Sequence, residues 1–199
     1  SMIYWIDQDS LFAFGNVQLN QSGRKLNADK LYFWETNGYR GSSFIASGDV
    51  TIIHLDKSIN AQSISYNDID QNMTLANDAK ILSDGRKLFG NDINIQFIDS
   101  LFSFIKVTGN AMAHNITYAK INKNDSTSQA LTDIMTGSMI NVSFDNDQIK
   151  NIVLDRMAST MYHAIDSMIL IGLNSVDGDS ISLNFTDDQL KSIHVKGDA

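Results

Sequence analysis

The sequence predicts an all-β fold of tandem antiparallel hairpins, and three observations support that prediction. Of the 23 acidic residues only Glu35 is a glutamate, and aspartate favours turns whereas glutamate favours helices. Short stretches such as residues 93–97 alternate apolar and polar side chains, which is typical of strands with one buried face. Similar segments also recur at fixed offsets along the chain, which is typical of repeat architectures.

The first repeat fills the N-terminal part of the chain. Residues 12–17 return 33 positions later as residues 45–50, and residues 26–31 return at the same offset as residues 59–64. A weaker copy begins at Asn77. Each copy predicts a strand, a polar turn and a second strand, because turn residues at this spacing fit hairpins better than crossover helices.

Glycines inside the strand-like stretches predict that the sheet bends. Gly15, Gly48 and Gly109 each lie inside such a stretch, and a glycine in that position usually marks a bulge or a sharp bend. Residues 115–130 interrupt the pattern, since they are rich in Asn, Ser and Lys and have little periodicity. We therefore predict a loop or a joint between subdomains there.

A second repeat follows that joint. Residues 137–152 match residues 178–193 at an offset of 41, and each copy predicts a hairpin. The stretch 157–172 between the copies fits a helix or a strand, and the sequence leaves both open. The predicted organisation is therefore hairpin repeats over 1–114 and two further hairpin repeats over 131–199 that continue the same pair of sheets.

A hairpin with one apolar face cannot bury that face alone, so successive hairpins are expected to stack into two facing, curved sheets. The inward residues suit either a packed core or an apolar channel. Ala28, Ala61 and Gly90 recur at equivalent inner positions, and such small residues favour the channel because they would leave room. The residues expected to line it are Val17, Leu19, Leu31, Val50, Ile52, Ile64, Ile81, Ile93 and Ile95.

The repeated motif resembles the LptA/OstA-type lipopolysaccharide-transport repeat. It consists of residues 15–17 followed by 26–31, and of residues 48–50 followed by 59–64; the resemblance covers about residues 11–114. The resemblance implies an open antiparallel β-jellyroll shaped like a folded slot. It also implies a location in the periplasm, with an association with the outer membrane as a further possibility.

The resemblance further implies a non-enzymatic protein that binds lipid. In that family the slot shelters the acyl chains of lipopolysaccharide or its lipid A part, and exposed edge strands add to other jellyroll proteins or to further copies, head to tail. Burying a lipid chain gains about 0.8 kcal/mol per methylene, so a generic apolar lining suffices. The expected edge strands lie near residues 3–6 and 193–195, and neither contains proline.

Two cationic turns predict a contact with the phosphates of such a lipid. Arg24 and Lys25 follow one turn, and Arg86 and Lys87 follow an equivalent one. If stacking places both turns on the same rim, these four side chains are expected to contact phosphate groups. The alternative is that they are solvated turn residues that keep the protein soluble.

The composition and the motifs argue against other classes of function. A net charge of −8 and a pI near 4.7 disfavour a nucleic-acid binder, which needs a basic surface. The absence of cysteine excludes disulfides, thiolate metal sites and cysteine catalysis. No nucleotide-binding or hydrolase signature is present, so no cofactor and no enzymatic activity are expected. No metal site is expected either, because the histidines lack metal-binding spacing; they are His54, His114, His163 and His194.

Two other classes of function also fit tandem repeats of this kind. One is a structural or adhesive β-solenoid built as a parallel β-helix, although its rungs are usually shorter than these repeats. The other is a carbohydrate-active β-helix enzyme, which would need aspartates clustered on one exposed face. Antiparallel pairing of the hairpins is the observation that separates the lipid carrier from both alternatives.

Overall fold

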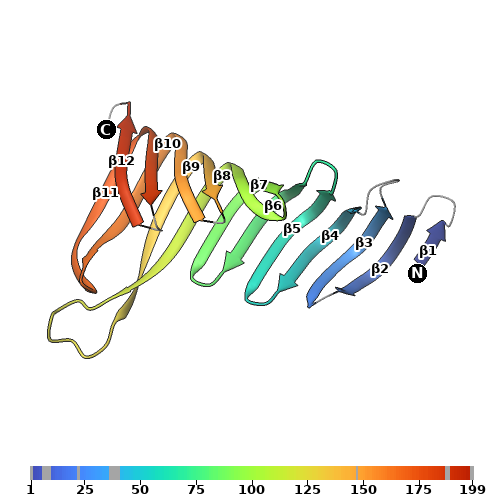
Figure 1. The fold of residues 1–199 in the computed structure, drawn as a ribbon, viewed down its shortest axis with the longest axis horizontal. Helices are drawn as coiled ribbons and strands as arrows, with labels where there is room; N and C mark the ends of the chain where they lie inside the picture. Colours follow the sequence, from blue (N-terminus) through green and yellow to red (C-terminus); the bar gives the residue numbers. More distant parts are fainter. Residues whose placement is uncertain are drawn as a thin grey trace.

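The computed structural model describes residues 2–5, 10–21, 23–35, 41–146, 148–186 and 189–197. These residues form twelve strands that join in chain order into one open sheet (Figure 1). The strands are β1 (Met2–Trp5), β2 (Ser10–Gln21), β3 (Arg24–Glu35), β4 (Ser42–His54), β5 (Lys57–Asn67), β6 (Asn72–Ser83), β7 (Arg86–Ile98), β8 (Leu101–Ala119), β9 (Gln129–Asp145), β10 (Gln148–Asp166), β11 (Ile169–Thr186) and β12 (Gln189–Lys196).

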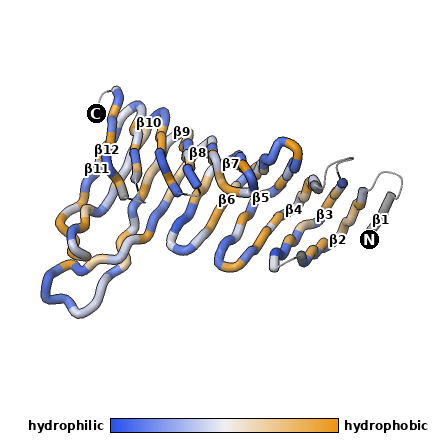
Figure 2. The backbone as a smooth tube through the Cα atoms, in the orientation of Figure 1, coloured by the Kyte–Doolittle hydropathy of each residue, from blue (hydrophilic) through white to orange (hydrophobic). Residues whose placement is uncertain are grey.

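Every pair of neighbouring strands is antiparallel. The predicted all-β, antiparallel fold is therefore confirmed, and the parallel β-helix underlying the two alternatives does not describe these strands. The strands form because apolar and polar residues alternate along them, as the hydropathy colouring of the backbone shows (Figure 2).

Bulges bend the sheet near the middle of its strands. Five strands each place two consecutive residues at positive φ, where the pairing register shifts. Left-handed backbone of this kind favours Gly, Asn and Asp, and four of the five pairs consist of those residues. The pairs are Gly15–Asn16, Gly48–Asp49, Asn77–Asp78, Gly109–Asn110 and Arg156–Met157. The bends predicted at the three glycines are confirmed.

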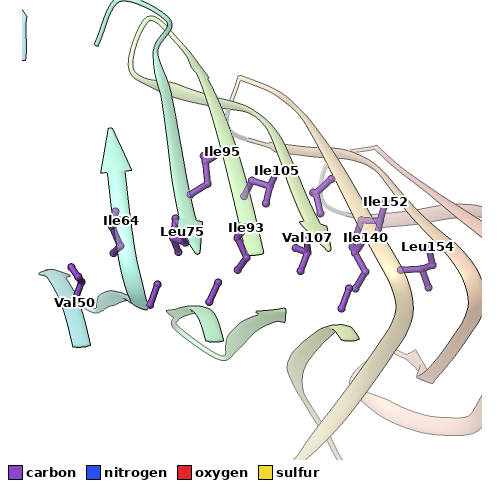
Figure 3. Close-up of a cluster of buried hydrophobic side chains, with 14 of the residues drawn as sticks. Val50, Ile64, Leu75, Ile93, Ile95, Ile105, Val107, Ile140, Ile152 and Leu154 are labelled. Carbon is purple, nitrogen blue, oxygen red and sulfur yellow. The ribbon is translucent and has the colours of Figure 1, made fainter. Parts of the chain in front are cut away.

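The aligned bulges divide the sheet into two arms. We call arm A the part that ends in the turns at residues 55–56 and 84–85, and arm B the part that ends in the turns at residues 68–71 and 99–100. Inward side chains from both arms form a single hydrophobic core. Its deepest part is a row in arm B in which each residue pairs with the next across the sheet (Figure 3). The row consists of Leu31, Ala46, Ile64, Leu75, Ile93, Val107, Ile140, Leu154 and Ile181, all buried.

The interruption predicted at residues 115–130 is shorter in the structure. Strand β8 continues to Ala119 and β9 begins at Gln129, so residues 120–128 alone lie outside the two strands. The polar residues at the end of β8 stay in the sheet because their side chains find partners across it. Asn115, for example, donates from Nδ2 to Asp133 Oδ2 at 3.3 Å. Strands β9 to β12 then continue the sheet in order.

The stretch 157–172, which the sequence left open between helix and strand, is extended. Strand β10 runs to Asp166, a turn occupies Ser167 and Met168, and β11 begins at Ile169. The β-branched isoleucines there therefore follow their strand propensity. Among the described residues there is no helix of the length and apolarity that crossing a membrane would require.

The small inner residues lie at the bends and do not leave open room. Ala28 and Ala61 are buried, at 6% and 5% exposure. A Cβ added to Gly90 would overlap the Cγ1 methyl group of Val107 on the neighbouring strand. The expectation that these residues keep a channel open is therefore wrong. Ala28 and Ala61 are packed in the core, and at Gly90 the neighbouring strand approaches too closely for a side chain.

One contact departs from the linear order of the sheet. The amide of Lys120 donates to the carbonyl of Met168 at 2.8 Å, and the amide of Leu170 donates to the carbonyl of Lys120 at 2.9 Å. Lys120 thereby forms an isolated parallel bridge with Ile169. This bridge ties the connection between β8 and β9 to the turn between β10 and β11.

Candidate functional site

The inner face of arm B carries a band of aromatic rings beyond the buried row. Ring centroids are 6.0 Å apart for Phe44 and Tyr66, and 6.3 Å for Tyr66 and Phe97. They are 5.4 Å apart for Phe97 and Phe102, and 5.7 Å for Phe102 and Phe144. All five rings are half-buried. We call this band the aromatic ladder; it offers a continuous apolar surface across strands β4 to β9.

The inner face of arm A carries a matching aliphatic band. Ile52 pairs with Ile59, Ile59 with Ile81, and Ile81 with Leu88 across strands β4 to β7. These four side chains are half-buried and pack against the core. The inner faces of both arms are therefore apolar and become more exposed with distance from the buried row.

The residues predicted to line a channel occupy three different environments. Leu31, Val50, Ile64, Ile93 and Ile95 belong to the buried core, at 3% exposure or less. Val17, Ile52 and Ile81 are half-buried and pack against it. The structure therefore brings these eight residues together, although the deepest of them fill a core.

Leu19 is the exception among the predicted lining residues. It pairs with Leu26 on β3 but remains 40% exposed. Among the described residues β1 pairs with β2 along Ser10–Ala13, so within that part of the chain no strand covers the free side of β2 at Leu19.

The aromatic ladder is missing from the sequence-predicted lining. A local signal for it does exist, because three of its rings stand shortly before an aspartate at the end of the strand or in the following turn: Tyr66 before Asp68, Phe97 before Asp99, and Phe144 before Asp145. That the rings touch across five strands depends on the register of the sheet, which the sequence does not display.

The predicted cations lie at the end of arm A. Arg24 begins β3 and Arg86 begins β7, so both flank turns on the same rim, as expected. Lys57, which begins β5, lies on this rim between them. These three side chains, like those of Lys25 and Lys87, are exposed. In the described part of the chain, no carboxylate oxygen forms an ion pair with any of them within 4.0 Å.

Tyr66, a member of the aromatic ladder, interacts with two charged side chains, those of Asp68 and Arg24. Its hydroxyl donates to Asp68 Oδ1 at 3.0 Å. Burial raises the pKa of Tyr66, the hydrogen bond and the negative charge of Asp68 raise it further, and the positive charge of Arg24 lowers it in part. Because Tyr66 belongs to arm B and Arg24 to the rim of arm A, this charge acts across the inner face.

A half-buried polar cluster lies where β9 and β10 separate. Asp133 Oδ1 accepts hydrogen bonds from the backbone N–H and from Nδ1 of His163, at 2.8 and 2.9 Å. Asp133 Oδ2 accepts from Asn115 Nδ2 and from Thr117 Oγ1. The cluster joins two hairpins, and both carboxylate oxygens of Asp133 have partners within the protein, which fits a structural role.

The outer face has a hollow of about 360 Å³ over strands β8 to β10, and a more polar one of about 230 Å³ lies over strands β4 to β6. Phe104, Met139 and Val153 form the apolar part of the larger hollow, and Lys106 and Asn141 are among its polar residues. Among the described residues, no group of three or more His, Asp or Glu side chains is placed to hold a metal ion. The half-buried bands of the inner face form the candidate ligand-binding surface, and their chemistry is apolar contact.

Comparison with known proteins finds a matching family and similar solved structures. Residues 4–100 match the family described as LptA/(LptD N-terminal domain) LPS transport protein. A similar solved structure is that of LptH from Pseudomonas aeruginosa, described as the LptA homologous periplasmic component of the conserved lipopolysaccharide transport device. It is 15% identical with a TM-score of 0.49, over 71% of this chain and 82% of that one. No match is found among curated proteins.

Proposed function

Through residues 4–100 the chain belongs to the LptA/LptD N-terminal domain family of lipopolysaccharide-transport proteins, and on that premise we propose that it shelters lipopolysaccharide acyl chains between its two arms. The proposal is of a non-enzymatic carrier that works in the periplasm, with the outer membrane as its expected neighbour. The aromatic ladder and the aliphatic band are the surfaces that contact the acyl chains.

The observation that supports this proposal most directly is how the two arms are held together. The strands pair in linear order within one sheet, and among the described residues the Lys120–Ile169 bridge is the one backbone pairing outside that order. The arms therefore meet mainly through apolar side chains. Apolar contact is non-directional, so acyl chains can replace contacts between the arms without breaking the hydrogen bonds of the sheet.

The energetics favour such an exchange. Each methylene removed from water contributes about 0.8 kcal/mol, so an acyl chain that lies along the half-buried bands gains several kcal/mol over a few methylenes. Residues of the deepest row already contact one another, with Ile64, Leu75 and Ile93 at 0% exposure. We therefore propose that the acyl chains lie on the half-buried bands and that the row below them supports the fold.

The two ends of the sheet suggest how the protein meets its partners. Strand β12 pairs with β11 alone, and β1 pairs with β2 alone, among the described residues. An unpaired edge is a template for strand addition. We propose that other jellyroll proteins of the transport system, or a second copy in a head-to-tail arrangement, add to these edges.

The cargo is tested by binding of fluorescent lipid A, with lipopolysaccharide as the competitor. Ile52 and Ile53 provide a matched pair, because they are neighbours on β4: Ile52 lies in the aliphatic band, and Ile53 is 39% exposed on the outer face. Ile52→Ser is expected to weaken binding about tenfold through lost apolar contact. Ile53→Ser is expected to leave the affinity unchanged.

A second pair of variants keeps the proposal testable if Ile52→Ser does not fold. Phe102 belongs to the aromatic ladder, whereas Phe104 lies on the outer face of the same strand and is 38% exposed. Phe102→Leu is expected to weaken lipid binding and Phe104→Leu to preserve it, with unfolding curves measured for each variant. Equal effects within both pairs, or a wild-type protein that binds no lipid, would contradict the proposal.

A further inference from the structure

The inner face of arm A ends in a row of cations. Arg24 pairs with His54, and Leu26 pairs with Ile52, without a register shift between them. Since residues two apart in a strand share a face, Arg24 lies on the same face as Leu26. The aliphatic band of the inner face is therefore followed, at the rim of arm A, by a charged side chain.

The same reasoning places two more cations on the inner face. Lys57 and Ile59 are two residues apart on β5, and Arg86 and Leu88 are two residues apart on β7, again without a register shift. Arg24, Lys57 and Arg86 lie on alternate strands of the sheet. With neighbouring strands about 4.8 Å apart, successive cations are about 10 Å apart along the rim. We call these three residues the inner cationic row.

Lys25 and Lys87 lie one residue further along and face the other way. Lys25 pairs with Ile53, which is exposed on the outer face. Lys87 pairs with Leu82 and His114. Each turn thus offers one cation to the inner face and one to the outer face, a distinction that the sequence expectation about these four residues did not make.

The rim of arm B carries the opposite charge. Exposed or half-buried carboxylates lie at the ends of its strands and in its turns, at Glu35, Asp68, Asp70, Asp99 and Asp145. Asp56 and Asp84 lie in the turns of arm A, but five cations at the same rim outnumber them. A ligand with apolar chains and anionic groups is therefore repelled by the rim of arm B and attracted by the rim of arm A. The charge difference therefore favours one orientation of an anionic lipid on the inner face.

We propose that Arg24, Lys57 and Arg86 bind the phosphate groups of an anionic glycolipid whose acyl chains lie between the arms. This inference rests on the proposed function and adds the position and orientation of the head group. Guanidinium groups suit phosphate because they donate two parallel hydrogen bonds. The coupling of Arg24 to Tyr66 in arm B supports the inward placement of that side chain.

Paired charge reversals in the full chain test the assignment. Arg24→Glu with Arg86→Glu changes the inner face, and Lys25→Glu with Lys87→Glu changes the outer face of the same two turns by the same net charge. The probe lipids are diphosphorylated lipid A and its dephosphorylated form. We expect the inner pair to weaken binding of the phosphorylated lipid at least tenfold and to change binding of the dephosphorylated lipid less than threefold. The outer pair is expected to change both less than threefold.

The outcomes separate this inference from the proposed function. Equal losses for the inner and outer pairs would show a general charge effect and overturn the inference. Displacement of the phosphorylated lipid by equimolar inorganic phosphate would also overturn it, because the rim would then be a site for free phosphate. In both cases binding of the dephosphorylated lipid leaves the proposed function standing. A wild-type protein that binds neither lipid contradicts both.

Discussion

Gly90 and Val107 lie so close on neighbouring strands that a Cβ at position 90 would occupy the place of a Val107 methyl group. The carbonyl oxygen of Thr108 would lie 3.1 Å from the same Cβ. Gly178 repeats this arrangement near the C-terminus, where its Cβ would lie 2.7 Å from Cγ1 of Val195. At these bends, close packing between adjacent strands requires a residue without a side chain.

Gly90→Ala is therefore expected to destabilise the protein by about 1–3 kcal/mol, the usual cost of overpacking a core. The measurement is the free energy of unfolding in urea. Gly172→Ala is the control, because nothing lies within 4 Å of the Cβ it would add, and it should change stability by less than about 0.5 kcal/mol. Equal stabilities for the two variants would mean that the strands do not approach closely at Gly90.

Much of the fold can be predicted from the sequence because the signals are local. Alternation over residues 93–97 indicates both the strand and the face that is buried, and Ile93 and Ile95 are indeed in the core. Gly15 and Gly48 indicate bends because left-handed backbone is costly for most other residues. Both signals come from a few adjacent residues and need no knowledge of distant partners.

The remaining features depend on contacts between residues far apart in the sequence. Asn115 looks like a loop residue until Asp133 is found opposite it on β9. Ala28 suggests empty space until its burial beside the bend is known. Lys25 resembles Arg24 as a candidate phosphate ligand, yet the register turns the two side chains to opposite faces. Neither periodicity nor composition carries such information.

Asp133 is expected to stabilise the packing of the C-terminal hairpins through the hydrogen bonds of its side chain. Its side chain accepts four hydrogen bonds from three residues, two of them from His163. Asp133→Ala would leave half-buried donors without acceptors, and we expect the free energy of unfolding in urea to fall by about 1–3 kcal/mol. Asp145→Ala is the control, because Asp145 is exposed and accepts from the adjacent Asn146.

The Asp133 substitution also has a local consequence that a merely global loss of stability would not produce. The backbone hydrogen bonds that join Lys120 to Met168 and Leu170 lie at the ends of the two hairpins that Asp133 connects. Hydrogen exchange at the amides of Lys120 and Leu170 should accelerate more than exchange in β5 and β6. Uniform acceleration over all strands would argue against the role of Asp133 in joining the two hairpins.

Tyr66 provides a titration that reports on the charge placed across the inner face. Its pKa is raised by burial and by Asp68, and Arg24 opposes that shift. Arg24→Gln should therefore raise the pKa of Tyr66 further, whereas Asp68→Asn should lower it toward the ordinary value. Phenolate absorbance measures the titration, and subtracting the curve of Tyr66→Phe isolates this residue from the other five tyrosines.

The raised pKa of Tyr66 also determines how the free energy of unfolding depends on pH in the alkaline range. Because the folded-state pKa of Tyr66 lies above the unfolded value of about 10, the folded protein favours the neutral phenol. The resulting stabilisation is fully present below the unfolded pKa and is lost as the pH rises through the folded pKa. Tyr66→Phe should therefore lose less stability than the wild type above about pH 10. If Arg24→Gln leaves the titration of Tyr66 unchanged, the charge of Arg24 does not reach the aromatic ladder, and the inward placement of the cationic row loses that support.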